Sequence, residues 1–546
     1  MRFARLLLMG LLFLYAGLGF TQLGTTRAVP CHIINNEFPY PFEYWDVLSG
    51  WTPEIDTDQS GSIDIRDMID FGFRPFRLDS LCAGIEKDHH MAGDYLAPGM
   101  AWGDYDGDGF ADLYLTDTNG PNTLFRNLGN GNFEVSALNA QVALAGVSSG
   151  GALFVDLDDD GWQDIYVLNR GPNAFFRNLG GTGFVESSEL AGIDDDKQGQ
   201  SAAAGDFNGD GFLDLYVVNW GELGSRDDVL YRNNGDGTFS DVSFLLTNPG
   251  GPGFAVSFLD FDNDGDLDIY VVNDKLWKNV LMRNDGSGCG EWCFTDVSAS
   301  SGADTSVDGM GLSVSDYDGD GDLDLYFSNA GPMFLLQNQT AQGSPTFIDV
   351  AQAEGVDFPS IGWGSFFFDY NNDGLQDLYL ATMDAEPELS NRLFQNRQGQ
   401  PFLDVTSNSG AANNGPSIGV TFADVEQDGS LDLIVGNMGA GYYFYRNQRA
   451  HSIGNNWITI KLVGGNGINK DAIGARVYVV TSGARTLFQE LKAGSSIGSN
   501  NEKILHFGLG LETISNLEVK WPNGVLSTLG VVSHNNRLVI TYIPPK

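Results

Sequence analysis

The chain has 546 residues, with 29 lysines and arginines against 72 aspartates and glutamates, which gives a formal net charge of −43. Nucleic acids and anionic membranes attract proteins through positive surface, so this charge argues against both as partners. The length is sufficient for several domains.

The N-terminus has the organisation of a secretory signal peptide. Arg2 and Arg5 precede an apolar run over residues 6–20, and a polar stretch ends at Ala28. We predict a signal peptide over residues 1–28 and a secreted, extracellular protein; the cell surface and the periplasm are the other compartments that export allows. An uncleaved anchor is the alternative, but the run is short for a membrane span, and we expect no span in the mature chain.

Residues 29–74 form an N-terminal segment with one motif. Oxygen-bearing side chains stand at positions 1, 3, 5, 9 and 12 of residues 56–67, with Gly61 at position 6, which is the spacing of an EF-hand calcium loop. The flanking helices are poorly marked, so an acidic linker is the alternative. The ligands that we predict are Asp56, Asp58, Ser60, Asp64 and Asp67, the last in place of the usual glutamate.

A second kind of acidic loop first appears at residues 104–112. Acidic residues occupy its positions 1, 3, 5 and 9, and Gly109 at position 6 lets the backbone turn with positive φ, which gathers the carboxylates around one point. Two carboxylates about 5 Å apart repel by roughly 3 kcal/mol at an effective dielectric of about 20. A divalent cation removes this repulsion, and Ca²⁺ suits such a flexible set of oxygens better than Mg²⁺.

The same loop occurs seven times, at intervals of 50 to 56 residues, which identifies a repeat protein. The seven loops begin at Asp104, Asp156, Asp206, Asp260, Asp316, Asp369 and Asp424.

Each repeat has four strand-like segments. A run of small apolar residues leads into the acidic loop, an apolar β run follows the loop, and two further segments begin with patterns such as Leu124-Phe-Arg-Asn127 and Phe239-Ser-Asp-Val242. Four antiparallel strands at this period predict an all-β fold, a seven-bladed β-propeller over residues 75–447, with a calcium loop in each blade.

The closure of this ring can also be predicted. No fourth strand of the usual pattern follows Asn447, but Phe76 and Gly84 have the spacing of Phe184 and Gly192 in a regular fourth strand. We therefore expect the segment before the first loop to complete the last blade, which removes an unpaired sheet edge.

The four cysteines of an exported chain suggest two disulfide bonds. Cys289 and Cys293 lie four residues apart in a glycine-rich turn, so we expect them to close a local loop. Cys31 and Cys82 would then pair by elimination.

Residues 455–543 differ from the repeats. Acidic loops stop, and alternating β-type runs appear, such as residues 457–463 and 475–480. We expect a small β-sandwich that forms a separate domain.

These patterns resemble known families. The seven units are similar to FG-GAP/VCBS repeats, the repeats of the integrin α-chain propeller. Residues 474–477 (Gly-Ala-Arg-Val), 506–510 (His-Phe-Gly-Leu-Gly) and 521–524 (Trp-Pro-Asn-Gly) resemble an ASPIC/UnbV domain. The whole order is similar to the cartilage acidic protein 1 family. The resemblance implies a calcium-stabilised extracellular propeller, with ions on one face and partner binding usually on the other.

The resemblance also implies a ligand set, with the backbone carbonyl at position 7 of each loop as a further ligand. Asn208, Asn371 and Glu426 depart from the all-aspartate pattern, so we expect weaker sites there. The implied ligands are Asp104, Asp106, Asp108 and Asp112; Asp156, Asp158, Asp160 and Asp164; Asp206, Asn208, Asp210 and Asp214; Asp260, Asp262, Asp264 and Asp268; Asp316, Asp318, Asp320 and Asp324; Asp369, Asn371, Asp373 and Asp377; and Asp424, Glu426, Asp428 and Asp432.

Repetition favours a structural role for calcium, since a catalytic metal needs an open position and nearby acid or base groups. The sequence has no nucleophile elbow, phosphate loop or HExxH motif. We expect His89 and His90 to lie at the surface and not to act as ligands. We expect a non-enzymatic adhesion or ligand-binding module whose partner is an extracellular protein or glycan.

Two alternatives stay open: a polysaccharide lyase or hydrolase, and a matrix or cell-wall component. Trp220, Trp277 and Trp363 are candidates for stacking on sugars, with packing between blades as the alternative.

Overall fold

A computed structural model describes residues 76–85, 87, 97–221, 228–247, 251–288, 292–340, 346–384, 387–413, 415–439, 441–448 and 454–545. The predicted signal peptide, the EF-hand-like loop, His89-His90, Cys31 and Cys289 lie outside these residues. The chain divides into two compact units, Met1–Thr52 and Pro53–Lys546, and everything below concerns the second. No helix among the described residues has the length and apolar character of a membrane span.

The predicted all-β propeller is confirmed. The repeats form groups of four antiparallel strands, which we call blades. Blade 1 is β2 (Met100–Gly103), β3 (Asp112–Leu115), β4 (Thr123–Asn127) and β5 (Phe133–Val135); blade 2 is β6 (Ser149–Val155), β7 (Asp164–Pro172), β8 (Ala174–Asn178) and β9 (Phe184–Glu186); blade 3 is β10 (Asp196–Gly205), β11 (Asp214–Asn219), β12 (Val229–Asn233) and β13 (Phe239–Asp241); blade 4 is β14 (Gly253–Leu259), β15 (Asp268–Asn273), β17 (Val280–Asn284) and β18 (Phe294–Asp296).

The remaining groups follow the same order of pairing. Blade 5 is β20 (Gly309–Ser315), β21 (Asp324–Gly331), β22 (Phe334–Asn338) and β23 (Phe347–Asp349); blade 6 is β24 (Ser360–Phe368), β25 (Asp377–Thr382), β26 (Arg392–Arg397) and β27 (Gln400–Asp404); blade 7 is β28 (Ser417–Ala423), β29 (Asp432–Asn437), β30 (Gly441–Asn447) and β1 (Phe76–Leu78). The short elements outside the blades are β16 (Trp277–Lys278), β19 (Ser306–Val307), α5 (Ser80–Ala83), α6 (Asn139–Val142), α7 (Ser188–Ala191), α8 (Ser298–Ser301), α9 (Ala351–Glu354), α10 (Thr406–Ser409), η2 (Ser243–Leu245) and η3 (Pro387–Leu389).

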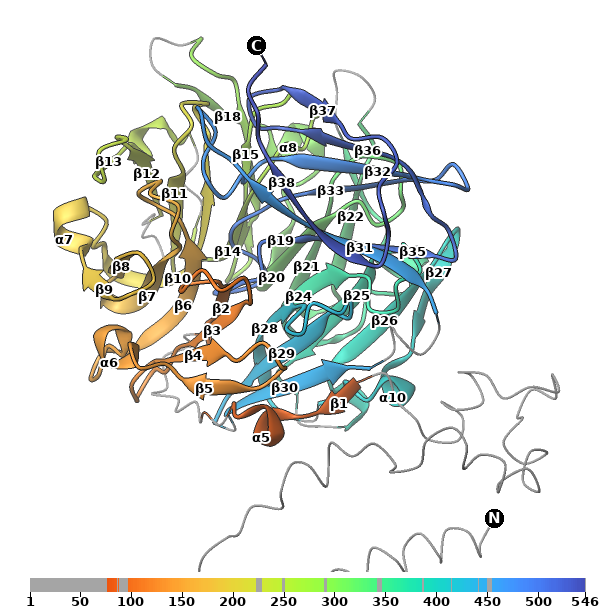
Figure 1. Cartoon of the computed structure of the whole chain (residues 1–546), viewed down its shortest axis with the longest axis horizontal. Coiled ribbons are helices and arrows are strands. Elements are labelled where there is room, and N and C mark those ends of the chain that lie inside the picture. Colours follow the sequence, from red (N-terminus) through yellow and green to blue (C-terminus); the bar gives the residue numbers. More distant parts are fainter. Residues whose placement is uncertain are drawn as a thin grey trace, which may run out of the picture. The chain divides into compact units, whose positions relative to one another are not determined.

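The first strands of the blades line the centre of the ring. Each contacts the first strand of the next blade, in the order β2, β6, β10, β14, β20, β24, β28 and back to β2. Figure 1 shows the blades following one another from orange through green to light blue. Small residues are required at this crowded centre: a Cβ atom added to Gly311 would lie 2.3 Å from the carbonyl oxygen of Trp363.

The expected ring closure is confirmed as well. Strand β1 pairs antiparallel with β30, with Phe76 opposite Asn447. Behind it, the carboxylate of Asp79, which is 3% exposed, accepts from Arg446 Nε at 2.7 Å and from Arg77 Nη2 at 3.1 Å. The last blade therefore contains a strand from each end of the repeat region, joined by a buried ion pair.

The C-terminal residues form two sheets of their own. One has the order β35-β31-β38 and the other the order β33-β32-β36-β37. Their apolar side chains share a core cluster with side chains of blades 2 and 3, among them Ile458 and Leu517 beside Leu153 and Leu215. The tail is therefore part of the same compact unit as the ring, and its status as a separate domain stays a prediction. The strands are β31 (Asn456–Val463), β32 (Arg476–Thr481), β33 (Thr486–Glu490), β34 (Ser499–Asn500), β35 (Leu505–Gly510), β36 (Ile514–Lys520), β37 (Leu526–Thr528) and β38 (Asn536–Thr541).

Residues 491–504, which connect β33 to β35, enter the centre of the ring, and we call them the plug. Strand β34 of the plug pairs in parallel with β2. Ser496 exchanges backbone hydrogen bonds with Leu312 of blade 5 (3.0 and 3.3 Å), and Ala204 N–H donates to the Ala493 carbonyl (3.1 Å). The sequence did not predict this insertion, because the plug carries no repeat motif.

Ile497 at the tip of the plug is fully buried in an apolar cluster with Phe254, Met310, Trp363 and Ile418. Trp363 is 3% exposed, which favours the packing role for it. Trp220 is half-buried at the edge of this cluster, with Lys275 Nζ 3.9 Å from its ring centroid. The plug therefore fills the channel from the side of the tail.

Candidate metal centres

The backbone of each acidic loop is held by the carboxylate at position 9. In loop 1, Asp112 is fully buried; its Oδ2 accepts from the Tyr105 N–H (3.1 Å) and its Oδ1 from the Asn127 N–H (2.8 Å). The bond that ties position 9 to the third strand therefore fixes the loop against its own blade. The same pair of bonds recurs at Asp164, Asp214, Asp268, Asp324 and Asp377.

The asparagine that ends each third strand joins neighbouring blades. Asn127 Nδ2 donates to the Ala111 carbonyl of its own loop (3.1 Å) and to the Val425 carbonyl of loop 7 (3.0 Å). Asn233 likewise bonds to Leu157 in the preceding loop (2.8 Å). Sequence reasoning used this residue only as a repeat marker, although its invariance within the chain was a signal of a structural role.

Carboxylates converge in four of the loops. Three ligand oxygens lie within 4.8 Å of one another in each of these groups. Among the described residues, the loops without such a group are those with Asn208, Asn371 or Glu426. The groups are Asp104, Asp106 and Asp108; Asp156, Asp158 and Asp164; Asp260, Asp262 and Asp268; and Asp316, Asp318 and Asp320.

Burial makes these carboxylates unfavourable as free anions. Removal from water, followed by the repulsion of neighbouring carboxylates, raises the pKa of Asp112 to about 9 and that of Asp156 to about 8. Burial is also the main reason that the pKa values of Asp260 and Asp316 rise to about 7. A bound cation would reverse these shifts by stabilising the charged form.

The donor set fits a hard cation. Each loop offers only carboxylate, amide and carbonyl oxygens at its ligand positions, and these are the donors that Ca²⁺ prefers. Two of the oxygens, Asp104 Oδ1 and Asp260 Oδ1, are buried without a hydrogen-bond partner. Such buried oxygens are normally satisfied, so a bound metal gives them the partner that the protein does not.

Arginines of the third strands reach the carboxylates at position 3, which the sequence analysis missed. Arg126 Nε lies 2.6 Å from Asp106 Oδ2, and Arg177 Nε lies 2.8 Å from Asp158 Oδ2. Arg446 pairs in the same way with Glu426. These arginines hold one oxygen of the carboxylate. The other oxygen of Asp106 accepts from the Asp108 N–H (3.2 Å), and that of Asp158 accepts from the Asp160 N–H (3.3 Å).

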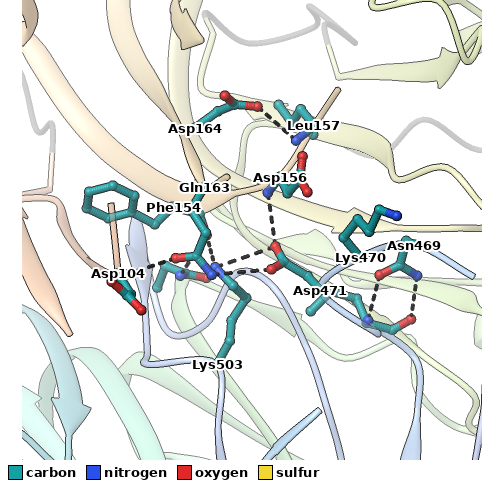
Figure 2. Close-up of polar contacts among 12 residues, drawn as sticks. Asp104, Phe154, Asp156, Leu157, Gln163, Asp164, Asn469, Lys470, Asp471 and Lys503 are labelled. Carbon is teal, nitrogen blue, oxygen red and sulfur yellow. Dashed lines mark hydrogen bonds and ion pairs between the residues drawn. The ribbon is translucent and has the colours of Figure 1, made fainter. Parts of the chain in front are cut away.

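The tail covers the loop face of the ring. Asp471 of the tail lies against loop 2, where its Oδ2 accepts from the Asp156 N–H (2.9 Å) and its Oδ1 from Gln163 Nε2 (3.2 Å). Lys503 Nζ is 3.6 Å from Asp471 Oδ2 and donates to the Phe154 carbonyl (2.7 Å), as Figure 2 shows. The tail thus presents both a cation and an anion to this loop.

Other loops meet other residues of the tail. Lys461 Nζ is 3.4 Å from Asp104 Oδ2, and Glu502 Oε2 accepts from the Asp424 N–H (3.0 Å). His506 Nε2 lies 2.7 Å from Asn372 Oδ1 in loop 6, and burial lowers the pKa of His506 to about 3, so it is neutral. Loops 1, 2, 6 and 7 therefore contact the tail, and this argues against a substrate site at these loops.

The pairing of the cysteines in the two predicted disulfide bonds stays a prediction. Cys293 is disulfide-bonded, and Cys289, the partner that the sequence predicts, lies outside the described residues.

Family comparisons agree with this architecture. The FG-GAP-like repeat model matches residues 104–155, 156–217, 218–271, 260–327 and 369–435, more than half of the chain, and the ASPIC and UnbV model matches residues 465–545. Cartilage acidic protein 1 from Xenopus tropicalis is 26% identical over 504 residues, covering 84% of this chain and 75% of that protein. Its Homo sapiens counterpart is 25% identical over 503 residues, covering 85% and 74%.

Solved structures match only loosely. An Agrocybe aegerita lectin, described for its recognition of non-reducing terminal N-acetylglucosamine, has a TM-score of 0.39 and 20% identity, covering 57% of this chain and 81% of that chain. AofleA from Arthrobotrys oligospora has a TM-score of 0.33 and 14% identity, covering 59% and 89%. Neither superposition carries an argument about function. On the repeat and domain matches, the chain belongs to the family of FG-GAP-repeat proteins, with a C-terminal ASPIC and UnbV domain.

Proposed function

We propose that this protein is a secreted calcium-binding propeller that acts as an extracellular ligand-binding or adhesion module, with calcium in a structural role. The observation that carries the proposal is the placement of the acidic loops. The carboxylates at position 9 are buried, those at position 1 are buried or half-buried, and Asp104 Oδ1 and Asp260 Oδ1 have no hydrogen-bond partner among the described residues. Metal held in this way stabilises the ring and meets no substrate.

We propose that the partner, an extracellular protein or glycan, binds the opposite face of the ring and the outer strands of the blades. The tail on the loop face and the plug in the channel support this proposal. The related proteins are named for cartilage and for acidity rather than for a reaction, which fits a binding role.

Thermal unfolding of residues 29–546 with excess Ca²⁺ and with EGTA tests the structural role of calcium. Binding to the folded state alone adds about 2.7 kcal/mol per site at a hundredfold excess over Kd. Several sites together should raise the transition by tens of degrees, and Mg²⁺ should not substitute because it demands a tighter octahedral site. An unchanged transition would refute the proposal.

The binding role needs its own measurement. Arrays of extracellular-matrix proteins and of glycans, probed with the calcium-loaded protein, should show a ligand that is lost in EGTA. Turnover of a polysaccharide without stable binding would instead favour an enzyme.

A further inference from the structure

The contact between loop 4 and the tail differs from the others because one tail side chain is buried against the metal ligands themselves. Arg476, at the start of β32, has a side chain that is 4% exposed. Its Nη2 donates to the Asp260 carbonyl at 2.6 Å and lies 3.1 Å from Asp260 Oδ2. Its Nη1 donates to Asn263 Oδ1 at 2.7 Å. One guanidinium thus holds the first and fourth residues of the loop.

The same guanidinium continues into the tail. Arg476 Nε donates to Glu490 Oε2 at 2.9 Å, and Glu490 Oε1 is 3.3 Å from Nζ of Lys492, the second residue of the plug. Because Glu490 is the last residue of β33, this ion pair joins loop 4 to the base of the plug. A planar, permanently charged fork is suited to bridging several oxygens in this way.

Arg476 leaves one oxygen of loop 4 unused. Asp260 is 3% exposed; its Oδ2 accepts from the Gly265 N–H (3.0 Å) and faces Arg476, whereas its Oδ1 is buried without a partner. Oxygens of Asp260, Asp262 and Asp268 lie within 4.8 Å of one another. A cavity of about 340 Å³, lined by Asp260, Asp264, Arg476 and Trp521 among others, adjoins this point.

We infer that loop 4 and the tail form one composite divalent-cation site, in which Arg476 is the positioning residue that orients Asp260 toward the metal. Metal binding at loop 4 and attachment of β32, β33 and the plug to the ring then stabilise each other. This inference rests on the proposed calcium binding, but it concerns one loop and one arginine.

Loop 5 provides a matched comparison. It has the same four aspartates and the same kind of carboxylate group, Asp316, Asp318 and Asp320. Among the described residues, no hydrogen bond or ion pair joins residues 316–324 to the tail. A change at position 3 of either loop should remove one cation, but only the change in loop 4 should reach the tail.

The experiment compares Asp262→Ala with Asp318→Ala in the full mature chain, with calcium stoichiometry by calorimetry and amide hydrogen exchange of residues 476–490 as readouts. Both variants should lose one bound Ca²⁺. In saturating calcium, exchange in residues 476–490 should rise about tenfold in Asp262→Ala and change less than twofold in Asp318→Ala. Equal exchange in the two variants would overturn the inference.

The reciprocal arm changes the tail. Coupling free energies between two binding events are the same in both directions, so Arg476→Lys should weaken one calcium site about tenfold, a difference of about 1.4 kcal/mol. In the Asp262→Ala background Arg476→Lys should have no further effect on calcium binding, because the site is already lost. Arg397→Gln is the charge control and should leave every site unchanged, because Arg397 bonds only to the Pro401 carbonyl within the part of the chain that the structure describes.

The outcomes separate the two hypotheses. Wild-type protein that binds no calcium refutes the proposed function. Wild-type protein that binds calcium while Arg476→Lys keeps every affinity refutes only the composite site. If Arg476→Lys does not fold, Asn263→Ala removes the contact of Arg476 Nη1 with the loop and should weaken the same site.

Discussion

In the ring, the same bonds recur: in six of the seven loops a buried aspartate at position 9 accepts two backbone N–H groups, and an asparagine ties each loop to its neighbour. In the tail, each contact with a loop occurs once: an aspartate at loop 2, an arginine at loop 4, a neutral histidine at loop 6 and a glutamate at loop 7. The repeated bonds give the blades of the ring the same local structure. The unique contacts fix which loop meets which part of the tail.

Among the contacts that occur once, the ion pair that closes the ring should have the largest effect on the free energy of unfolding. Asp79→Ala removes the buried carboxylate between Arg77 and Arg446 and leaves the buried guanidinium of Arg446 without one of its two carboxylate partners. We expect unfolding free energy to fall by about 3 to 5 kcal/mol, the usual cost of breaking a buried pair. Urea unfolding in calcium measures it.

Asp236→Ala serves as the control for Asp79→Ala, because Asp236 is exposed and, among the described residues, bonds only to Thr238. A loss that is equal in the two variants would mean that the closing strand adds nothing to the stability of the ring.

A substitution in the plug should have the second-largest effect on the free energy of unfolding. Ile497→Ala deletes buried methyl groups in the cluster with Phe254 and Trp363, and large-to-small changes of this kind cost about 2 to 5 kcal/mol. We expect a loss of about 3 kcal/mol in chemical denaturation. Leu511→Ala, at a tail side chain that is 82% exposed, should be neutral. A neutral Ile497→Ala would show that the plug rests in the channel without stabilising it.

The stability of the repeated loops should depend on pH without metal and lose this dependence with metal. In the metal-free protein the pKa values of Asp112 and Asp156 are raised to about 9 and about 8, above their unfolded values near 4. Stability from such groups is fully present below the unfolded pKa and is lost as the pH rises through the folded pKa. Melting temperature in a chelator should therefore fall between pH 5 and pH 9.

Saturating calcium should remove this fall, because the cation holds the carboxylates in their charged form. Melting curves over the same pH range, recorded with Ca²⁺, provide the comparison. A parallel fall in both conditions would show that the titrating carboxylates are not the metal ligands.

The smallest effect should come from a substitution that gives loop 3 the aspartate found at position 3 of the all-aspartate loops. Asn208→Asp adds a carboxylate at position 3 of loop 3 and removes the amide that donates to Asp210 (2.9 Å). We expect calcium affinity at one site to rise several-fold, since site affinity increases with ligand charge. Calorimetric titration measures it, with Asn234→Asp outside the loop as control. Unchanged affinity would place loop 3 outside the set of metal sites.

The sequence by itself determined the ring. Periodic acids, the position-6 glycines and the Arg-Asn endings predicted the blades, and the spacing of Phe76 and Gly84 predicted the closing strand, because each of these features depends on contacts within one repeat or between neighbouring repeats. The acidic loops could also be predicted from the sequence, since all the predicted ligands of one loop lie within nine residues.

Only the tertiary structure decided what covers the loops. Arg476 and Asp260 are more than 200 residues apart, and Ser496 contacts Leu312 across the channel. Nothing in local periodicity encodes such pairs, because each occurs once and depends on how the tail's two sheets settle on the ring. The chain's repeats thus define where metal can bind, and its unrepeated tail decides what surrounds each metal.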